Sequence, residues 1–329
     1  MSKKSILVLL LFNFLIGGQS HDYSNLSTLS ILPFIGILLS ISIIPLINHH
    51  FWEDNFGKIS LFWSALFFIP FYYFYKEAAL YELMHVILLE YIPFIILIGS
   101  LFIIAGGVKI DGSLVGTPKL NSIMLFIGFT LASWMGTTGA AMLLIRPLIQ
   151  ANVNRKHKTH IIVFFIFLVA NIGGALTPLG DPPLFLGFLN GVDFFWTTIH
   201  LFSPMIFLGF FLLCFFFILD SYYYKMEDGQ DNSDIYRPLK IEGKFNFLLI
   251  VGVILAVLMS GTWNPHIHCT FFGVHLELQN ILRDILLLLF SVSSWKLTNI
   301  SIRESNKFTW FPIMEVSKLF IGIFITIIP

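Results

Sequence analysis

Long apolar stretches separated by short polar loops make up most of this chain. Each of the longer stretches could cross about 30 Å of hydrocarbon at the 1.5 Å rise per residue of an α-helix. They cover residues 29–47, 59–75, 83–105, 196–219 and 245–261, a shorter one covers 281–294, and a last one begins at Phe308. This pattern predicts an all-α, polytopic helical membrane protein.

Two further apolar segments, 121–149 and 160–190, are interrupted by residues that break helices. The second contains, at 171–183, the sequence Asn-Ile-Gly-Gly-Ala-Leu-Thr-Pro-Leu-Gly-Asp-Pro-Pro, which no continuous helix can accommodate. Irregular backbone at membrane depth is tolerated only where it is buried in protein or lines a watery cavity. A substrate or ion site is the usual reason for such a cavity, so this segment is the main functional candidate.

The placement of basic residues predicts the path of the first interrupted segment. If 121–149 simply crossed the membrane, the loop with Lys109 and Lys119 would lie opposite the loop with Arg155, Lys156 and Lys158. The positive-inside rule disfavours that arrangement. We therefore predict a re-entrant hairpin that turns at 136–139 and returns to the same face, with both basic loops cytoplasmic.

The composition of the chain supports a membrane location. Hydrophobic residues make up 57% and charged residues 12% of the sequence, and the mean hydropathy is +0.85. With a net charge of zero and no basic patch beyond short loops, no nucleic-acid partner is expected. Residues 1–20 resemble a signal peptide or an uncleaved anchor, 21–329 are predicted to form the helical membrane domain, and 220–244 are predicted to form a cytoplasmic loop.

The predicted hairpin carries hydroxyl groups and small residues at its tip. Gly136 and Gly139 permit an unusual backbone, and Ser133, Thr137 and Thr138 flank or separate them. Their hydroxyls could satisfy freed backbone groups or coordinate a cation, and these two interpretations remain open.

Asp181 is the most informative single residue, because a carboxylate in the membrane interior costs about 2.5–3.5 kcal/mol. Oxygen ligands suit a hard cation such as Na⁺, so Asp181, the Thr177 hydroxyl and nearby carbonyls form a candidate site. Gly173, Gly174 and Gly180 would let the backbone approach closely. The alternative is that Asp181 only caps a half-helix starting at Pro182.

Other charged residues in the spans have structural alternatives. Glu90 is a candidate proton carrier, or an interfacial residue that pairs with His85 or Lys76. Arg146 is expected to anchor the hairpin end rather than bind a substrate carboxylate. Structural pairing is expected for Arg283 with Asp284 and for Glu315 with Lys318. A cluster of His266, His268, Cys269 and His275 lacks metal-site spacing, so no metal beyond Na⁺ is expected.

These residues lie in strings that resemble NhaD-type sodium/proton antiporters, of a superfamily that also contains citrate, dicarboxylate and arsenite carriers. The strings are Gly-Thr-Thr-Gly-Ala-Ala-Met-Leu-Leu-Ile-Arg-Pro-Leu-Ile at 136–149, Arg-Lys-His-Lys at 155–158, and Asn-Ile-Gly-Gly-Ala-Leu-Thr-Pro-Leu-Gly-Asp-Pro-Pro-Leu-Phe-Leu-Gly-Phe-Leu at 171–189. The resemblance implies an inverted-repeat transporter that exchanges Na⁺, or Li⁺, for H⁺ across the inner membrane by alternating access. It assigns one half of the ion site to Ser133, Thr137, Thr138, Asn171, Thr177 and Asp181.

The resemblance also implies the partners of the protein and a second half-repeat. The transported Na⁺ and H⁺ and the membrane lipid are the expected partners, no organic cofactor is expected, and the moving part would work against a scaffold that often forms a homodimer. After Pro183 no second hairpin and broken helix follow, so we expect a chain truncated before its second half-repeat. The alternatives are an anion carrier for carboxylates or arsenite, and an inactive remnant.

Overall fold

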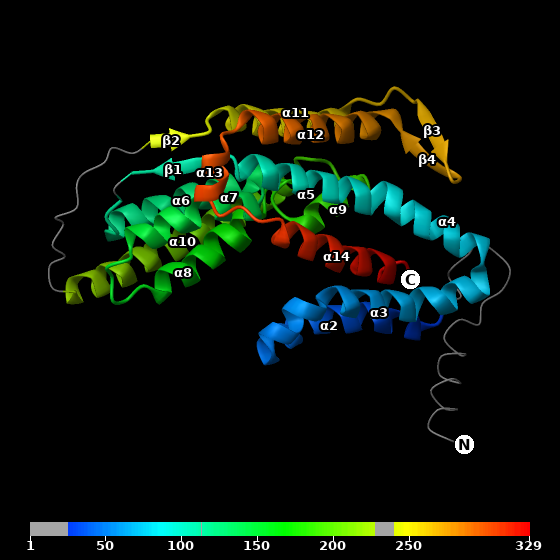
Figure 1. Ribbon diagram of the computed structural model, residues 1–329, viewed down its shortest axis with the longest axis horizontal. Helices are drawn as coiled ribbons and strands as arrows, with labels where there is room; N and C mark the ends of the chain where they lie inside the picture. The colour runs from blue at the N-terminus through cyan, green and yellow to red at the C-terminus, as the bar shows by residue number, and fades with distance from the viewer. Residues whose placement is uncertain (1–25, 113, 228–239) are drawn as a thin grey trace, which may run out of the picture. The chain divides into compact units, whose positions relative to one another are not determined.

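The computed structural model describes residues 26–112, 114–227 and 240–329, and most of these residues are helical (Figure 1). Their contacts divide them into two compact units. The first contains the described residues up to Ile95 together with His268–Glu277 and Thr309–Pro329, and the second contains Ile96–Ile267 and Leu278–Phe308. The signal-like segment 1–20 lies outside the described residues.

The first unit is built around one long helix. Helix α3 (His49–Tyr75) packs against α2 (Leu32–Ile47) on one side and α14 (Phe311–Thr326) on another. A buried group of Trp52, Phe56 and Leu319 forms one of its cores. The remaining elements of this unit are a 3₁₀ turn (Thr28–Ile31), α4 (Glu77–Val86), a π-helical turn (Ile87–Tyr91), and the antiparallel hairpin of β3 (His268–Phe271) and β4 (Val274–Glu277).

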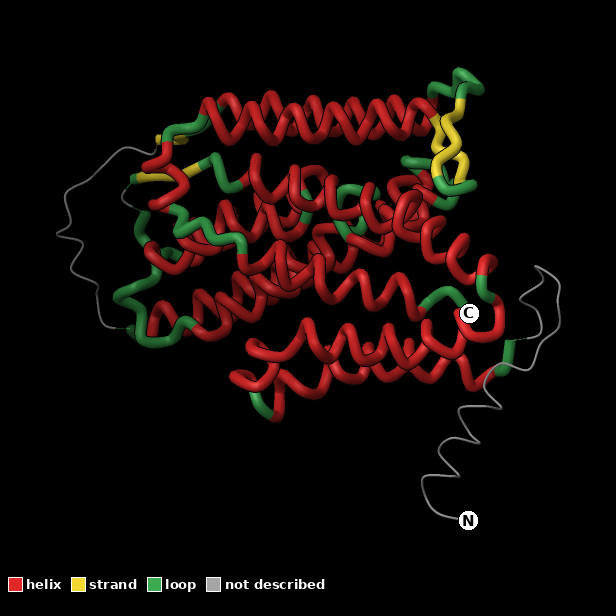
Figure 2. The backbone as a smooth tube through the Cα atoms, turned by 45° about the vertical axis from the view of Figure 1, so that its right-hand side comes forward, coloured by secondary structure: helices red, strands yellow, loops and turns green. Residues whose placement is uncertain are grey.

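The second unit contains both interrupted segments. Its α11 (Phe245–Thr262) and α12 (Leu278–Leu297) lie side by side (Figure 2). The other elements are α5 (Ile92–Ala105, mostly in this unit), β1 (Lys109–Asp111), α6 (Pro118–Met135), α7 (Thr137–Ala151), α8 (Thr159–Phe165), α9 (Pro182–Leu189), α10 (Trp196–Met226), β2 (Lys240–Glu242) and α13 (Ile300–Ser305).

Apolar helices long enough to cross a membrane confirm the predicted fold class. Within the described residues, four helical stretches meet this criterion: Thr28–Ile47, Glu77–Ala105, Trp196–Met226 and Phe245–Thr262. Large apolar side chains remain exposed along them, as at Phe207 and Phe210 of α10, whose exposed fractions are 65% and 63%. Such surfaces are stable in lipid, so this is an all-α, polytopic membrane protein.

Both predicted helix breaks are present. Helix α6 ends at Met135 and α7 starts at Thr137, so the hairpin turns at Gly136 alone; the expected four-residue turn at 136–139 is wrong because Thr137, Thr138 and Gly139 already belong to α7. The second segment passes from α8 through a π-helical stretch (Ile166–Asn171) and a 3₁₀ turn (Ile172–Gly174) to α9.

The two basic loops lie at the same end of the second unit, as the hairpin predicts. Arg155 Nη1 donates to the carbonyl oxygen of Gly116 at 3.1 Å, and the amide side chains of Asn121 and Asn152 hydrogen-bond to each other. The hairpin therefore returns to the side from which it enters.

The expected loop at 220–244 is wrong at its start. Helix α10 continues to Met226, and Asp220 is fully buried within the helix. Lys240–Glu242 then pairs as β2 with β1 in antiparallel register. The carboxylate of Asp220 is retained in the helix because a buried cation neutralises it, a contact that local sequence does not reveal.

Candidate functional site

The turn between α6 and α7 depends on a glycine. Gly136 has φ = +79°, a backbone conformation in which a side chain would be strained. This conformation lets the N–H of Thr137, at the start of α7, donate to the carbonyl oxygen of Gly180 at 3.1 Å. The tip of the hairpin is thus joined directly to the break that precedes α9.

Two buried hydroxyl groups hold the hairpin against the broken helix. Ser133 Oγ donates to the carbonyl oxygen of Gly173 at 2.5 Å and accepts from the N–H of Leu176 at 3.2 Å. Thr177 Oγ1 donates to the carbonyl oxygen of Ser133 and accepts from the N–H of Leu179. Both hydroxyls therefore satisfy backbone groups that the helix break leaves without helical partners.

Close backbone approach at this contact requires glycine. A Cβ atom at Gly180 would overlap the carbonyl oxygen of Gly174, and one at Gly173 would lie 2.8 Å from the carbonyl oxygen of Phe129. Gly139 is less constrained, since its Cβ would approach that of Ala105 at 3.1 Å. The two breaks consequently meet through their backbones, which brings several carbonyl groups together.

Asp181 stands at the end of this contact with its side chain exposed. It occupies the N-cap position of α9, but its carboxylate makes no capping hydrogen bond. The main-chain carbonyl of Asp181 accepts from Leu184 and Phe185, as at the start of any α-helix, and Pro182 and Pro183 carry no N–H group that could donate to the side chain. The carboxylate is therefore not used as a side-chain cap.

Asn171 and Thr138 are less closely joined to this contact. Asn171 Nδ2 donates to the carbonyl oxygen of Ile166 at 3.3 Å within its own helix, and Thr138 is exposed in the first turn of α7. Asn171 and Glu90 each fall in a π-helical segment, and such segments are frequent at functional sites. Glu90 is half-buried and belongs to the first unit, whereas the hairpin belongs to the second.

Arg283 of α12 is a buried cation beside α9. Its Nε lies 2.8 Å from Asp284 Oδ1, which confirms the expected pairing, and its Nη1 donates to Asn280 Oδ1 at 3.1 Å. The guanidinium lies 5.8 Å from the ring centroid of Phe185, one turn after Asp181. Among the described residues, Nη2 is buried without a hydrogen-bond partner, a feature that sequence reasoning missed although an arginine within an apolar span was its signal.

A second buried cluster joins the loop after α7 to α8 and α10. Arg155, expected only as a basic loop residue, lies 2.8 Å from Asp220 Oδ1 through Nη2 and 3.0 Å from Glu227 Oε2 through Nε. His160 Nε2 and Asn121 Nδ2 also contact the carboxylate of Asp220, each at 2.9 Å. This cluster holds together the end of the second unit where the two interrupted segments begin.

Two other charged residues make different contacts. The expected pair of Glu315 and Lys318 is not found among the described residues, because Glu315 accepts from Trp52 Nε1 and Lys318 Nζ lies over the ring of Phe56. Arg146 Nη1 donates to the carbonyl oxygen of Ser305 at 3.2 Å, consistent with an anchor at the hairpin end.

A hairpin and a broken helix that meet within an apolar helical protein are typical of membrane transporters, in which discontinuous helices form the substrate site. The family described as "Putative citrate transport" matches residues 23–329, nearly the whole chain, so the protein belongs to this family of transporters. No curated protein and no solved structure matches the chain.

Proposed function

We propose that this transporter exchanges Na⁺ for H⁺ by alternating access, with Asp181 as the shared ligand. The observation that carries the proposal is the position of Asp181: its carboxylate is exposed and uncapped where the hairpin tip meets the broken helix. Carboxylate and carbonyl oxygens suit a hard monovalent cation. A carboxylate at membrane depth needs a cation or a proton, so occupancy by one ion displaces the other.

The half-helix after Asp181 favours a cation over an anion. Anions bind helix N-termini through free N–H groups, and the first two residues of α9, Pro182 and Pro183, have none. Arg146 lies nine residues into α7 from Thr137, about 14 Å along the helix, which is too far for it to clamp an anion at the tip.

The test is a transport assay on the full chain. Everted vesicles from a sodium-sensitive, antiporter-deficient bacterium that expresses the protein should show an Na⁺-induced change of internal pH. Asp181→Asn should abolish the response, whereas Asp193→Asn should retain it, because Asp193 is exposed and its carboxylate accepts from the N–H of Phe195 in a surface turn. An unchanged response in Asp181→Asn would refute the assignment of the ion ligand.

A carboxylate carrier is the second candidate, and Arg283 is the observation that favours it. Its buried Nη2 has no hydrogen-bond partner in the part of the chain that the structure describes and lies near α9, where a substrate carboxylate could accept from it. The family description, "Putative citrate transport", also names a carboxylate as the substrate. In proteoliposomes this candidate predicts uptake of labelled citrate that Arg283→Gln abolishes, with Na⁺ binding left intact; Na⁺-dependent pH change without citrate uptake would favour the first candidate.

A further inference from the structure

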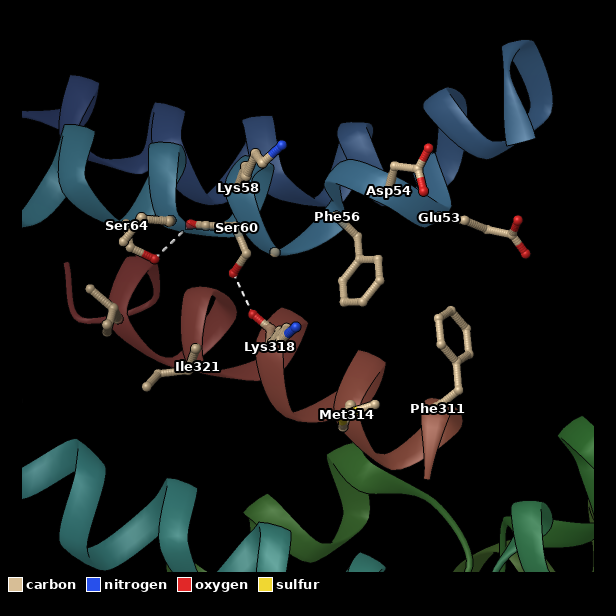
Figure 3. Close-up of a pocket in the computed structure, with 13 residues that line it drawn as sticks. Glu53, Asp54, Phe56, Lys58, Ser60, Ser64, Phe311, Met314, Lys318 and Ile321 are labelled. Atoms are coloured by element: carbon tan, nitrogen blue, oxygen red, sulfur yellow. Dashed lines mark hydrogen bonds between the residues drawn. The ribbon is translucent and has the colours of Figure 1, made fainter. Parts of the chain in front are cut away.

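A cavity of about 610 Å³ lies between α3 and α14 in the first unit (Figure 3). It is separate in sequence from the hairpin and the broken helix, and none of the residues considered for the ion site lines it. Its walls are apolar along most of their length, with charged residues toward the N-terminal part of α3. The cavity therefore suits a molecule with an apolar part and a charged part.

The apolar part of the cavity is open to the surroundings of the helices. Leu61 and Met314, which line it, have exposed fractions of 69% and 47%. Ile321 and Ile325 extend the apolar wall along α14. In a membrane protein, an open apolar groove between two helices accepts a hydrocarbon chain.

Lys318 directs its charge toward the polar end of the cavity. The Ser60 hydroxyl donates to the carbonyl oxygen of Lys318 at 2.5 Å, so the backbone of Lys318 lies at the level of Ser60 (Figure 3). Its Nζ nevertheless lies 5.4 Å from the ring centroid of Phe56, about one helical turn closer to the N-terminus of α3. This is the behaviour of a lysine that snorkels toward the headgroup level.

Opposite charges gather at that level. Glu53 and Asp54 line the cavity one turn or less before Phe56, and Lys58 lines it half a turn after. Glu53 is exposed and lies 3.2 Å from His49, while Lys58 donates to Asn55. The polar end thus offers two ammonium groups, of which that of Lys58 is bonded to Asn55, and two carboxylates within about two turns of helix.

We propose that this cavity binds a zwitterionic phospholipid with a primary ammonium headgroup, as in phosphatidylethanolamine. Lys318 would bind the phosphate, Glu53 would accept hydrogen bonds from the ammonium group two carbons away, and one acyl chain would follow the apolar wall. A purely anionic headgroup would meet the repulsion of Glu53 and Asp54. A choline headgroup carries no N–H to donate to them.

The headgroup must provide the selectivity of such a site. Every lipid tail is as apolar as the groove, so exchanging one tail for another changes the binding free energy little. Discrimination between headgroups therefore reports on Lys318 and Glu53 rather than on general contact with lipid.

The test is native mass spectrometry of the purified full chain with equal amounts of phosphatidylethanolamine, phosphatidylcholine and phosphatidylglycerol. We expect bound phosphatidylethanolamine to exceed each of the others at least fivefold. Lys318→Met and Glu53→Gln should each remove most of this excess. Lys296→Met and Glu304→Gln, which change exposed residues that do not line the cavity, should leave it unchanged.

Charge reversal separates binding from a folding defect. Glu53→Lys changes an exposed side chain and should shift the preference to phosphatidylglycerol, a gain that misfolding cannot produce. Equal binding of the three lipids, a preference for phosphatidylglycerol in the native chain, or an excess that survives both Lys318→Met and Glu53→Gln would overturn the proposal.

Discussion

Arg155 Nη2 lies 2.8 Å from Asp220 Oδ1, and neither side chain is exposed. One residue belongs to the loop between α7 and α8, and the other to α10. Asn121 at the start of α6 contacts the same carboxylate, so this ion pair joins the hairpin, the broken helix and α10 at one end of the second unit.

Removing the cation from this pair should destabilise the protein strongly. Arg155→Met leaves the Asp220 carboxylate buried without its main positive partner, which typically costs about 3–5 kcal/mol. Thermal unfolding in detergent, followed by tryptophan fluorescence, should show a much lower midpoint. Lys156→Met is the matched control, because Lys156 is adjacent and exposed; equal midpoints for the two variants would contradict the prediction.

The buried hydroxyls of Ser133 and Thr177 should matter for both stability and transport. Thr177→Val leaves the N–H of Leu179 without its acceptor and the carbonyl of Ser133 without its donor, at a cost of about 1–3 kcal/mol. We expect a lower unfolding midpoint and loss of the vesicle response, with recovery in Thr177→Ser.

The control for this change is Thr130→Val in α6. The hydroxyl of Thr130 is exposed and bonds only to the carbonyl of Phe126 within its own helix, so its loss should have little effect. If Thr177→Val behaves like Thr130→Val, the Thr177 hydroxyl does not hold the two breaks together.

The positions of the spans and of both helix breaks could be predicted because the bilayer imposes simple rules. Length and apolarity define the spans, and Gly136 and the glycines and prolines clustered at 171–183 interrupt the helices. The placement of Lys109 and Arg155 on one side was enough to predict the hairpin. These are properties of local sequence and of charge counted along it.

The partners of buried charges could not be predicted in the same way. Asn121 and Asp220 lie 99 positions apart and meet only through the packing of α6 against α10. Likewise, the contacts of the Ser133 and Thr177 hydroxyls follow from how two breaks fit together. The sequence indicated that the buried carboxylate and the two hydroxyls need hydrogen-bond partners, but it did not indicate which residues provide them.

Gly136 should not tolerate a side chain. Its φ of +79° and ψ of +148° lie in a region that essentially only glycine adopts, so a side chain would cost on the order of 1–3 kcal/mol, and the turn would shift Thr137 away from Gly180. Gly136→Ala should therefore lower both the unfolding midpoint and transport. Gly99→Ala, inside α5 where a Cβ meets nothing within 4 Å, should leave transport intact and raise the midpoint slightly, since alanine favours helix by about 1 kcal/mol.

Competition between Na⁺ and H⁺ at Asp181 should appear as a pH-dependent apparent KM. A protonated carboxylate does not bind Na⁺. At pH values below the pKa of the site, each tenfold rise in proton concentration should therefore raise the apparent KM for Na⁺ about tenfold, while the maximal rate at saturating Na⁺ stays unchanged. Initial rates measured in vesicles across pH 6–9 should show this pattern, and Asp193→Asn should preserve it. A KM that stays constant while only the maximal rate falls would mean that the proton acts elsewhere, and Glu90→Gln would then be the next variant to measure, because Glu90 is the candidate proton carrier that the sequence indicates.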